Sequence, residues 1–297
     1  MSVYAPAVKI EHFHASDGYV FHYRHWKPAV AVPRGHVVSL HGIQSHSGWY
    51  EFSSRRLAEA GYDVRFLDRR GSGMNEQQRG HAPHYSRLMN DVAQFLAFVR
   101  HHGNRHSPGA PVILQAVSWG GKLAAAVAAA RPELVDALAL LYPGIHGKIR
   151  VKWHERMLLR LANSLGMTHK RVPIPLDEPA LFTDAPAWRQ FICDDPLMLH
   201  EATVGFLNAS IDLDRAARRA VADIQCPTLL MLAGRDRIID NDKTRQYFGR
   251  IAARRRVLYE YADAAHTLDF EPDRERIFDD LLGWLEGLNE PARRKAA

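Results

Sequence analysis

The sequence has little of what marks secreted, membrane-spanning or metal-binding proteins. Its 297 residues include only 2 cysteines, Cys193 and Cys226, which lie far apart and lack metal-like spacing. The longest apolar runs, such as residues 123–130, fall well short of the roughly 20 residues that a transmembrane helix needs. Residues 1–11 lack the basic region and apolar stretch of a secretory signal. We therefore expect a reduced, cytoplasmic protein.

Positive charge is in modest excess, with a formal net charge of +6. The basic residues are scattered and form only short clusters at 254–256 and 293–295. No nucleic-acid-binding motif accompanies them, so we expect no nucleic-acid partner. Histidines gather at 12 and 14 and again at 101, 102 and 106, and we interpret them as solvated side chains rather than metal ligands. The sequence predicts no cofactor and no particular oligomeric state.

What the sequence does contain is an alternation of strand and helix patterns. Helical periodicity is present over residues 84–101, 121–131 and 273–288. Eight segments have strand patterns, namely 8–14, 19–26, 36–40, 62–67, 111–117, 135–142, 226–232 and 256–261. This order predicts a mainly parallel eight-stranded sheet with helices on both faces and an antiparallel hairpin at one edge.

One connection is much longer than a single crossover helix requires. About 80 residues separate the strands that end near 142 and begin near 226, and prolines divide this stretch into several helical patterns. We interpret residues 144–208 as a helical cap inserted over the carboxyl ends of the strands, where such sheets bind ligands. The core domain then comprises residues 1–143 and 209–297.

A nucleophile turn is predicted at the end of the strand over 111–117. The run Ala116-Val117-Ser118-Trp119-Gly120 is a G-x-S-x-G pattern with alanine in the first place, and it passes directly from strand to helix. Small residues two positions before and after the serine permit the sharp turn. A serine hydroxyl needs a base to remove its proton before it can attack a carbonyl carbon.

The acid and the base are expected downstream, each after a strand. Asp236 follows the strand over 226–232, and His266 follows the strand over 256–261, which gives the order Ser, Asp, His that the α/β-hydrolase fold imposes. We predict Ser118 as nucleophile, His266 as base and Asp236 as the acid that orients it. Asp240 and Asp263 stay open as weaker alternatives for the acid. Backbone N–H groups of Ile43 and Trp119 are predicted to bind the oxyanion.

Four further motifs resemble the monoacylglycerol lipase and lysophospholipase group of α/β-hydrolases, also described as serine aminopeptidase-like. The similarity covers about residues 17–285 and is carried by the stretches 41–50 (HGIQSHSGWY), 68–73 (DRRGSG), 181–183 with 195–197, and 234–240 (GRDRIID). Ala116, Gln44 and Trp49 depart from the commonest family residues. The resemblance implies hydrolysis of carboxylic esters with one acyl chain, without a cofactor.

Substrate contacts are expected from the stretch over 41–50 and from the cap. We expect His41, Gly42 and His46 to contact the substrate, a small acyl ester, together with Trp153 and Met157 on an apolar stripe of the cap. The basic residues around this stripe are Lys148, Arg150, Lys152, Arg156 and Arg160. Packing on the core domain is the expected role of the stripe, and weak peripheral contact with a membrane is the alternative.

The sequence leaves three candidate functions open. The leading one is an esterase acting on monoacylglycerol-like or lysophospholipid-like esters through an acyl-enzyme on Ser118. A thioesterase or acyltransferase that uses carrier- or coenzyme A-bound acyl groups would employ the same residues. A noncatalytic binding protein on this fold is the third, and the presence of all three expected catalytic side chains disfavours it.

Overall fold

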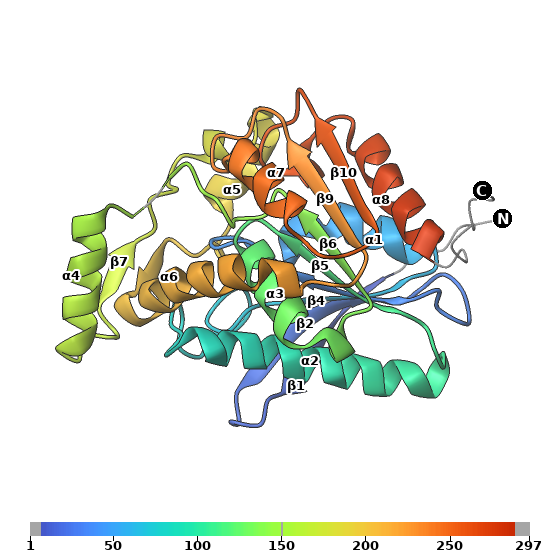
Figure 1. The fold of residues 1–297 in the computed structure, drawn as a ribbon, viewed down its shortest axis with the longest axis horizontal. Helices are drawn as coiled ribbons and strands as arrows, with labels where there is room; N and C mark the ends of the chain where they lie inside the picture. Colours follow the sequence, from blue (N-terminus) through green and yellow to red (C-terminus); the bar gives the residue numbers. More distant parts are fainter. Residues whose placement is uncertain (1–6, 150, 289–297) are drawn as a thin grey trace.

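The computed structural model describes residues 7–149 and 151–288, and its centre is an eight-stranded sheet (Figure 1). The strand order is β1-β2-β4-β3-β5-β6-β9-β10. β2 pairs antiparallel with both β1 and β4, and the other neighbours are parallel. The strands are β1 (Val8–His14), β2 (Val20–Trp26), β3 (His36–Leu40), β4 (Asp63–Leu67), β5 (Val112–Val117), β6 (Ala137–Leu141), β9 (Thr228–Ala233) and β10 (Arg256–Tyr261). The predicted sheet with its antiparallel edge is confirmed.

Helices cover both faces of this sheet, as expected. On one face α1 packs with α8, and on the other α2, α3 and α6 pack with one another (Figure 1). The core helices are α1 (Glu51–Glu59), α2 (Tyr85–His106), α3 (Trp119–Ala130), α6 (Val204–Arg219), α7 (Asn241–Gly249) and α8 (Arg274–Leu288). In the described part of the chain, no helix has both the length and the apolar character needed to cross a membrane.

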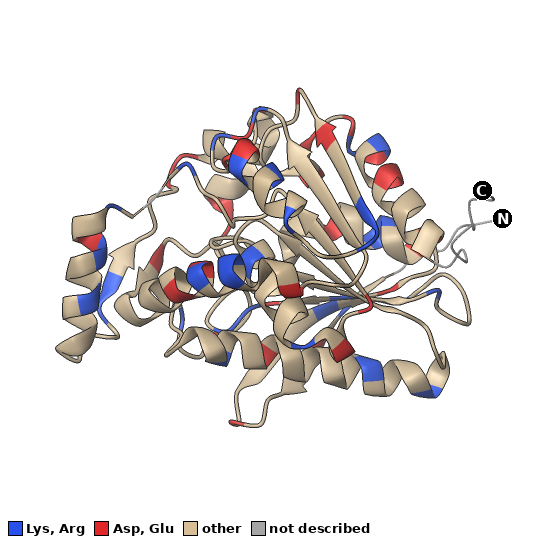
Figure 2. Cartoon of the chain, viewed as in Figure 1, with Lys and Arg blue, Asp and Glu red and all other residues tan. Residues whose placement is uncertain are grey.

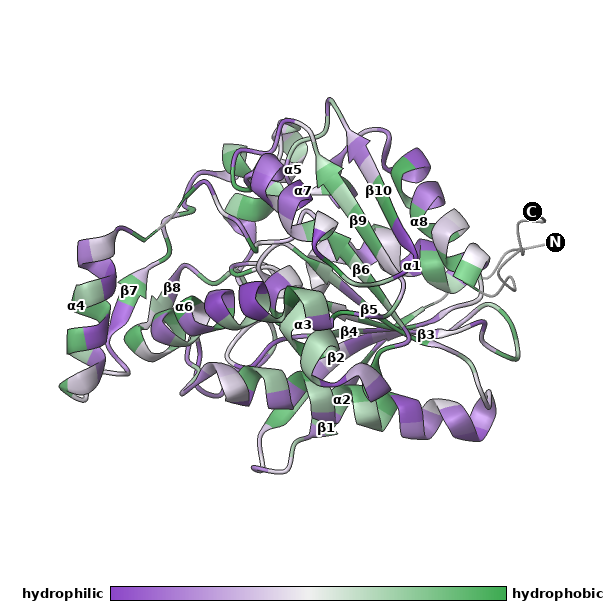
Figure 3. Cartoon of the chain, viewed as in Figure 1, coloured by the Kyte–Doolittle hydropathy of each residue, from purple (hydrophilic) through white to green (hydrophobic). Residues whose placement is uncertain are grey.

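The central strands are buried on both faces, and their sequences explain why. β5, β6 and β9 are buried along their whole length and read VILQAV, ALALL and TLLMLA, so they stand out as mostly hydrophobic in Figure 3. A strand covered by helices on both sides has no solvent face, whereas β1, at the edge, is largely exposed. Removal of this apolar surface from water stabilises the fold and holds the strand ends in fixed positions.

The long connection after β6 contains the segment that we interpret as a cap. Its elements are α4 (Trp153–Ser164), β7 (Arg171–Pro173), α5 (Pro186–Asp194) and β8 (Glu201–Thr203). The helix that follows, α6, begins at Val204 with the Thr203 hydroxyl accepting from the Phe206 N–H, and it packs on α3 of the core. The predicted boundary at residue 208 therefore falls inside α6, which is one continuous helix. The outer limits predicted at 1 and 297 lie outside the described residues.

The apolar stripe of α4 is exposed instead of packed. Arg160 of α4 forms an ion pair with Asp212 of α6, which fixes the helix at the end of the molecule farthest from β10 (Figure 1). The exposed apolar side chains are Trp153 (76%), Met157 (65%), Leu158 (63%), Leu161 (55%) and Leu165 (67%). The expectation that this stripe packs on the core domain is wrong, because α4 meets α6 through other positions.

Candidate active site

Ser118 occupies the sharp turn between β5 and α3. Its φ of 48° lies in a region that residues other than glycine rarely adopt, so the turn holds the serine in a strained backbone conformation. Gly120 is needed because a Cβ there would lie 2.7 Å from the His41 carbonyl oxygen and 2.8 Å from the Leu40 carbonyl oxygen. Ala116 is fully buried in β5, so its extra methyl group is accommodated.

Ser118, His266 and Asp236 form a line of hydrogen bonds. His266 Nε2 lies 3.0 Å from Ser118 Oγ, and His266 Nδ1 lies 2.7 Å from Asp236 Oδ2. The histidine and the aspartate are 1% and 2% exposed, so water does not compete for these contacts. The three residues come from the carboxyl ends of β5, β9 and β10, as the sequence predicted. Such a line can move the serine proton to the imidazole.

Asp236 is held by its own loop. Its second carboxylate oxygen accepts from the N–H groups of Ile238 and Ile239, at 2.7 and 2.8 Å. Lys148, at the start of the cap, donates to the Asp236 carbonyl oxygen, a contact that sequence reasoning missed. Of the two alternative acids, Asp240 caps α7 by accepting from the Lys243 N–H, and Asp263 has an exposed position.

The loop after β3 lies beside Ser118 and is fixed from two sides. The Gly42 N–H donates to Ser45 Oγ at 3.0 Å, and that hydroxyl is 2.8 Å from the Tyr50 hydroxyl. The Ile43 carbonyl oxygen accepts from the Arg69 guanidinium at 2.8 Å. Ile43 lines the cavity that contains Ser118, as does Trp119, whose N–H in the first turn of α3 has no partner within the helix.

His41 and His46 hold this loop and do not line the cavity. Burial lowers the pKa of His41 to about 3, so the ring is neutral; it donates to the Gly42 carbonyl oxygen and accepts from the Arg69 N–H. His46 Nε2 lies 3.0 Å from the carboxylate of Asp195 in the cap. Protein groups thus occupy the ring nitrogens of both histidines, which the sequence predicted to contact the substrate. Gly42 borders a small cavity between Ser118 and His266.

The two arginines after β4 have different roles. Arg70 forms a buried ion pair with Asp91, at 2.7 Å. Arg69 was not singled out from the sequence, yet its guanidinium is buried over the rings of Trp119 and Phe206, 4.7 and 4.6 Å from their centres. Burial lowers its pKa to about 9. Arg69 therefore links the loop at Ile43 to the first turn of α3.

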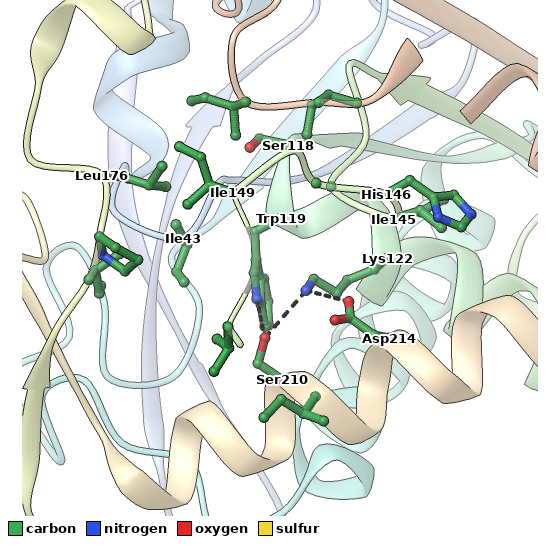
Figure 4. A pocket seen from close by; sticks show the side chains of 18 of the residues that line it. Ile43, Ser118, Trp119, Lys122, Ile145, His146, Ile149, Leu176, Ser210 and Asp214 are labelled. Carbon is green, nitrogen blue, oxygen red and sulfur yellow. Dashed lines mark hydrogen bonds and ion pairs between the residues drawn. The ribbon is translucent and has the colours of Figure 1, made fainter. Parts of the chain in front are cut away.

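A cavity of about 180 Å³ opens from Ser118 between the core and the cap (Figure 4). We call it the Ser118 cavity. Its apolar lining is formed by Ile43, Trp119, Ile145, Ile149, Val151, Ile174, Leu176, Leu207, Ile211, Ile238 and Ile239. Trp153 and Met157 are not among the residues that line it. The cap contributes apolar lining from its irregular segments, which carry no periodic pattern that could identify them.

Asp269 is a buried carboxyl group close to the site. It accepts from the Ser53 N–H through one oxygen, at 3.2 Å, and its other oxygen finds no partner among the described residues. Burial raises its pKa to about 7. Because the folded state holds this proton more tightly than the unfolded state does, stability falls as the pH rises from about 4 towards 7.

We expect Asp269→Asn to remove this loss of stability at higher pH. At pH 8 the variant is expected to be more stable than the wild type by up to about 4 kcal/mol, and at pH 4 the two are expected to be similar. Urea unfolding at both pH values measures the difference. Equal stability of the two proteins at pH 8 would contradict the raised pKa of Asp269.

The fold and this arrangement are those of the α/β-hydrolases. Residues 31–273 match the model of the family described as serine aminopeptidase, S33 (Hydrolase_4), and the chain belongs to that family. The chain is similar to monoacylglycerol lipase of Mycolicibacterium smegmatis, with 29% identity over 94% of this chain and 98% of that protein. It is also similar to human monoglyceride lipase, with 26% identity over 94% and 91%.

Solved structures show the same architecture. A soluble variant of monoglyceride lipase from Saccharomyces cerevisiae, in complex with a substrate analogue, superposes with a TM-score of 0.84, at 18% identity over 98% of this chain and 99% of that one. Monoacylglycerol lipase from Paleococcus ferrophilus superposes with a TM-score of 0.79, at 21% identity over 90% and 99%. The family and the two curated lipases together identify the chain as a carboxylic ester hydrolase.

Proposed function

We propose that the chain hydrolyses esters through an acyl-enzyme on Ser118. His266 Nε2 takes the hydroxyl proton while Ser118 Oγ attacks the carbonyl carbon. The same nitrogen returns the proton to the alcohol oxygen as the C–O bond breaks, which leaves the acyl group on the serine. Water then repeats the sequence and releases the acid. The observation that carries this proposal is the line from Ser118 Oγ through His266 to Asp236.

The remaining groups stabilise the charges of this reaction. Asp236 keeps the His266 Nδ1 proton in place and stabilises the imidazolium that forms. The N–H groups of Ile43 and Trp119 are proposed to bind the negative oxygen of the tetrahedral intermediate, which supports about a hundredfold to a thousandfold in rate for each donor. Arg69 acts as a positioning residue for both, through the Ile43 carbonyl oxygen and the Trp119 ring.

The proposed substrates are esters with a single acyl chain, of the monoacylglycerol or lysophospholipid type. Support comes from the apolar lining of the Ser118 cavity and from the activities named for the two curated lipases. The same acyl-enzyme would form if the acyl group were transferred to an acceptor other than water, or if the substrate were a thioester. Both reactions are therefore part of the test. We also retain the predicted cytoplasmic location, which fits two cysteines that form no disulfide.

A substrate panel tests this assignment. It contains 1-monoacylglycerols of increasing chain length, the matching lysophosphatidylcholines, di- and triacylglycerols, and acyl-coenzyme A. We expect kcat/KM for at least one single-chain ester to exceed that for the two- and three-chain esters by about tenfold or more, because a cavity shaped for one chain binds the second only at the cost of clashes. Faster cleavage of acyl-coenzyme A than of every oxygen ester would favour the thioesterase instead.

The exposed stripe of α4 is proposed to contact lipid surfaces weakly. Trp153 and Met157 lie beside Lys152 and Arg156, a combination that favours anionic membranes. The basic residues that the sequence placed around the stripe include Arg150, which lies outside the described residues. Across the described chain as a whole, Lys and Arg are interspersed with Asp and Glu (Figure 2). Membrane contact would bring the cap to the place where single-chain esters accumulate.

We predict that the protein floats with anionic phosphatidylserine vesicles at low ionic strength. A Trp153→Glu/Met157→Glu double variant is expected to stay at the bottom of the gradient, because it replaces apolar contact with negative charge. Val32→Glu, at another exposed apolar position, serves as the matched control and is expected to float like the wild type. Wild-type protein that remains at the bottom would rule out the membrane contact.

A further inference from the structure

The Ser118 cavity has a charged end that the proposed mechanism does not use. Lys122, in the first turn of α3, points its ammonium group into this end, 2.6 Å from Asp214 Oδ1 and 3.3 Å from Ser210 Oγ, both on α6. The same hydroxyl accepts from Trp119 Nε1 at 2.9 Å. Figure 4 shows the Trp119 side chain extending from near Ser118 to this cluster, so the nucleophile and the ammonium group are joined by one continuous wall.

The position of Lys122 is unusual for a charged side chain. It is only 6% exposed, and removal of an ammonium group from water is unfavourable unless close partners compensate. The amino end of a helix is also its positive end, so a cation in the first turn of α3 is further disfavoured. Asp214 is the compensating carboxylate. An ordinary apolar acyl cavity would need no such pair.

Positive charge is in excess along the lining of the Ser118 cavity. The described residues that line the cavity include the cations Lys122, Arg156 and Arg218 but only one carboxylate, Asp214. Arg218 Nη2 lies 3.5 Å from the second oxygen of Asp214, so this one carboxylate is shared by two cations. The Arg218 Nε finds no partner among the described residues. A ligand with negative charge would therefore meet two cations, Lys122 and Arg218, that have a single carboxylate between them.

We propose that this end of the cavity binds an anionic group of the substrate, a carboxylate or a phosphate, and that Lys122 and Arg218 select for it. The inference rests on the proposed ester hydrolysis and narrows its substrates to esters with negative charge away from the scissile bond. The anion has two possible sources: the far end of the acyl chain or the alcohol part. In either case the anion accepts a charge-assisted hydrogen bond from Lys122, and it partly neutralises the excess positive charge of the cavity lining.

Two pairs of matched esters distinguish the sources. The first pair is monomethyl octanedioate with methyl octanoate, which differ only by a terminal carboxylate. The second is 1-octanoyl-glycerol 3-phosphate with 1-octanoyl-glycerol. For each pair, the ratio of kcat/KM for the anionic ester to that for the neutral ester is measured in the wild type and in Lys122→Met, a variant of similar shape without the charge.

We expect the ratio to fall by about tenfold or more in Lys122→Met for at least one pair, chiefly through a higher KM for the anionic ester. Lys122→Arg is expected to restore most of the preference, because it retains the positive charge. Arg218→Met is also expected to lower the ratio of kcat/KM for the anionic ester to that for the neutral ester. If Lys122→Met does not fold, Arg218→Met alone tests whether this end of the cavity binds an anion. Lys243→Met, an exposed lysine on α7, is the matched control and is expected to leave both ratios unchanged.

Ratios within twofold of the wild type for both pairs, in Lys122→Met and in Arg218→Met, would overturn the proposal. A binding experiment separates this outcome from failure of the proposed function. Calorimetric titration of Ser118→Ala with the same four esters requires no turnover. Tighter binding of an anionic ester than of its neutral partner, lost on adding Lys122→Met, would support the anion site even if the wild type hydrolysed none of them. Equal binding of both members of each pair would exclude it.

Discussion

Replacement of Ser118 with alanine is expected to lower kcat for ester hydrolysis by about 10⁵- to 10⁶-fold. The variant retains the expected oxyanion donors and the Ser118 cavity, but it lacks the oxygen that becomes acylated. His266 is then left without a proton to transfer. Initial rates with 1-octanoyl-glycerol, measured at high enzyme concentration, provide the required range.

The fold of this variant is expected to be intact. Alanine fits the space of the serine side chain, and among the described residues the side-chain hydrogen bond that is lost is the one to His266. A melting temperature close to that of the wild type checks this point. Ser164→Ala, on the exposed part of α4, is the matched serine control and is expected to retain full activity. Activity of Ser118→Ala near that of the wild type would refute the mechanism.

The second large effect is expected from Asp236→Asn, with a loss in kcat of about 10⁴-fold. An amide can still accept from the Ile238 and Ile239 N–H groups through its oxygen, so its NH₂ group faces His266. This arrangement favours the wrong tautomer of the imidazole, with the proton on the nitrogen that must accept from Ser118. Single-turnover acylation measured by stopped flow reports the loss directly.

Asp263→Asn is the control for this substitution, because Asp263 was a competing candidate for the acid and lies in the loop before His266. Its exposed carboxylate is expected to contribute less than a few-fold to kcat. A large loss in Asp263→Asn with little loss in Asp236→Asn would transfer the role of the acid to the other residue.

The sequence specifies the sheet and the ends of its strands well. Apolar runs such as those of β5 and β9 are continuous because both faces are covered, and each ends where a small or polar residue begins the turn. The strained turn at Ser118 needs Gly120, so local pattern and tertiary position agree there. For this reason the relative placement of Ser118, Asp236 and His266 follows from strand order alone.

The cap and the surroundings of the site could not be predicted in the same way. The exposed stripe on α4 has the periodicity of a packed helix, and only the tertiary structure shows that it faces away from the core. The boundary at residue 208 was placed from the length of the connection, and it falls inside α6, whose N-cap residue is Thr203. The pair between Lys122 and Asp214 joins positions 92 apart on two helices, and no local pattern connects them.

The central claim is that Ser118 is the activated nucleophile of this chain. Its most direct test is labelling of the native protein with a fluorophosphonate, followed by mass spectrometry of the proteolytic peptides. We expect a single adduct, on the hydroxyl oxygen of Ser118. Complete absence of reaction in the folded wild-type protein, or an adduct on a different serine, would contradict it.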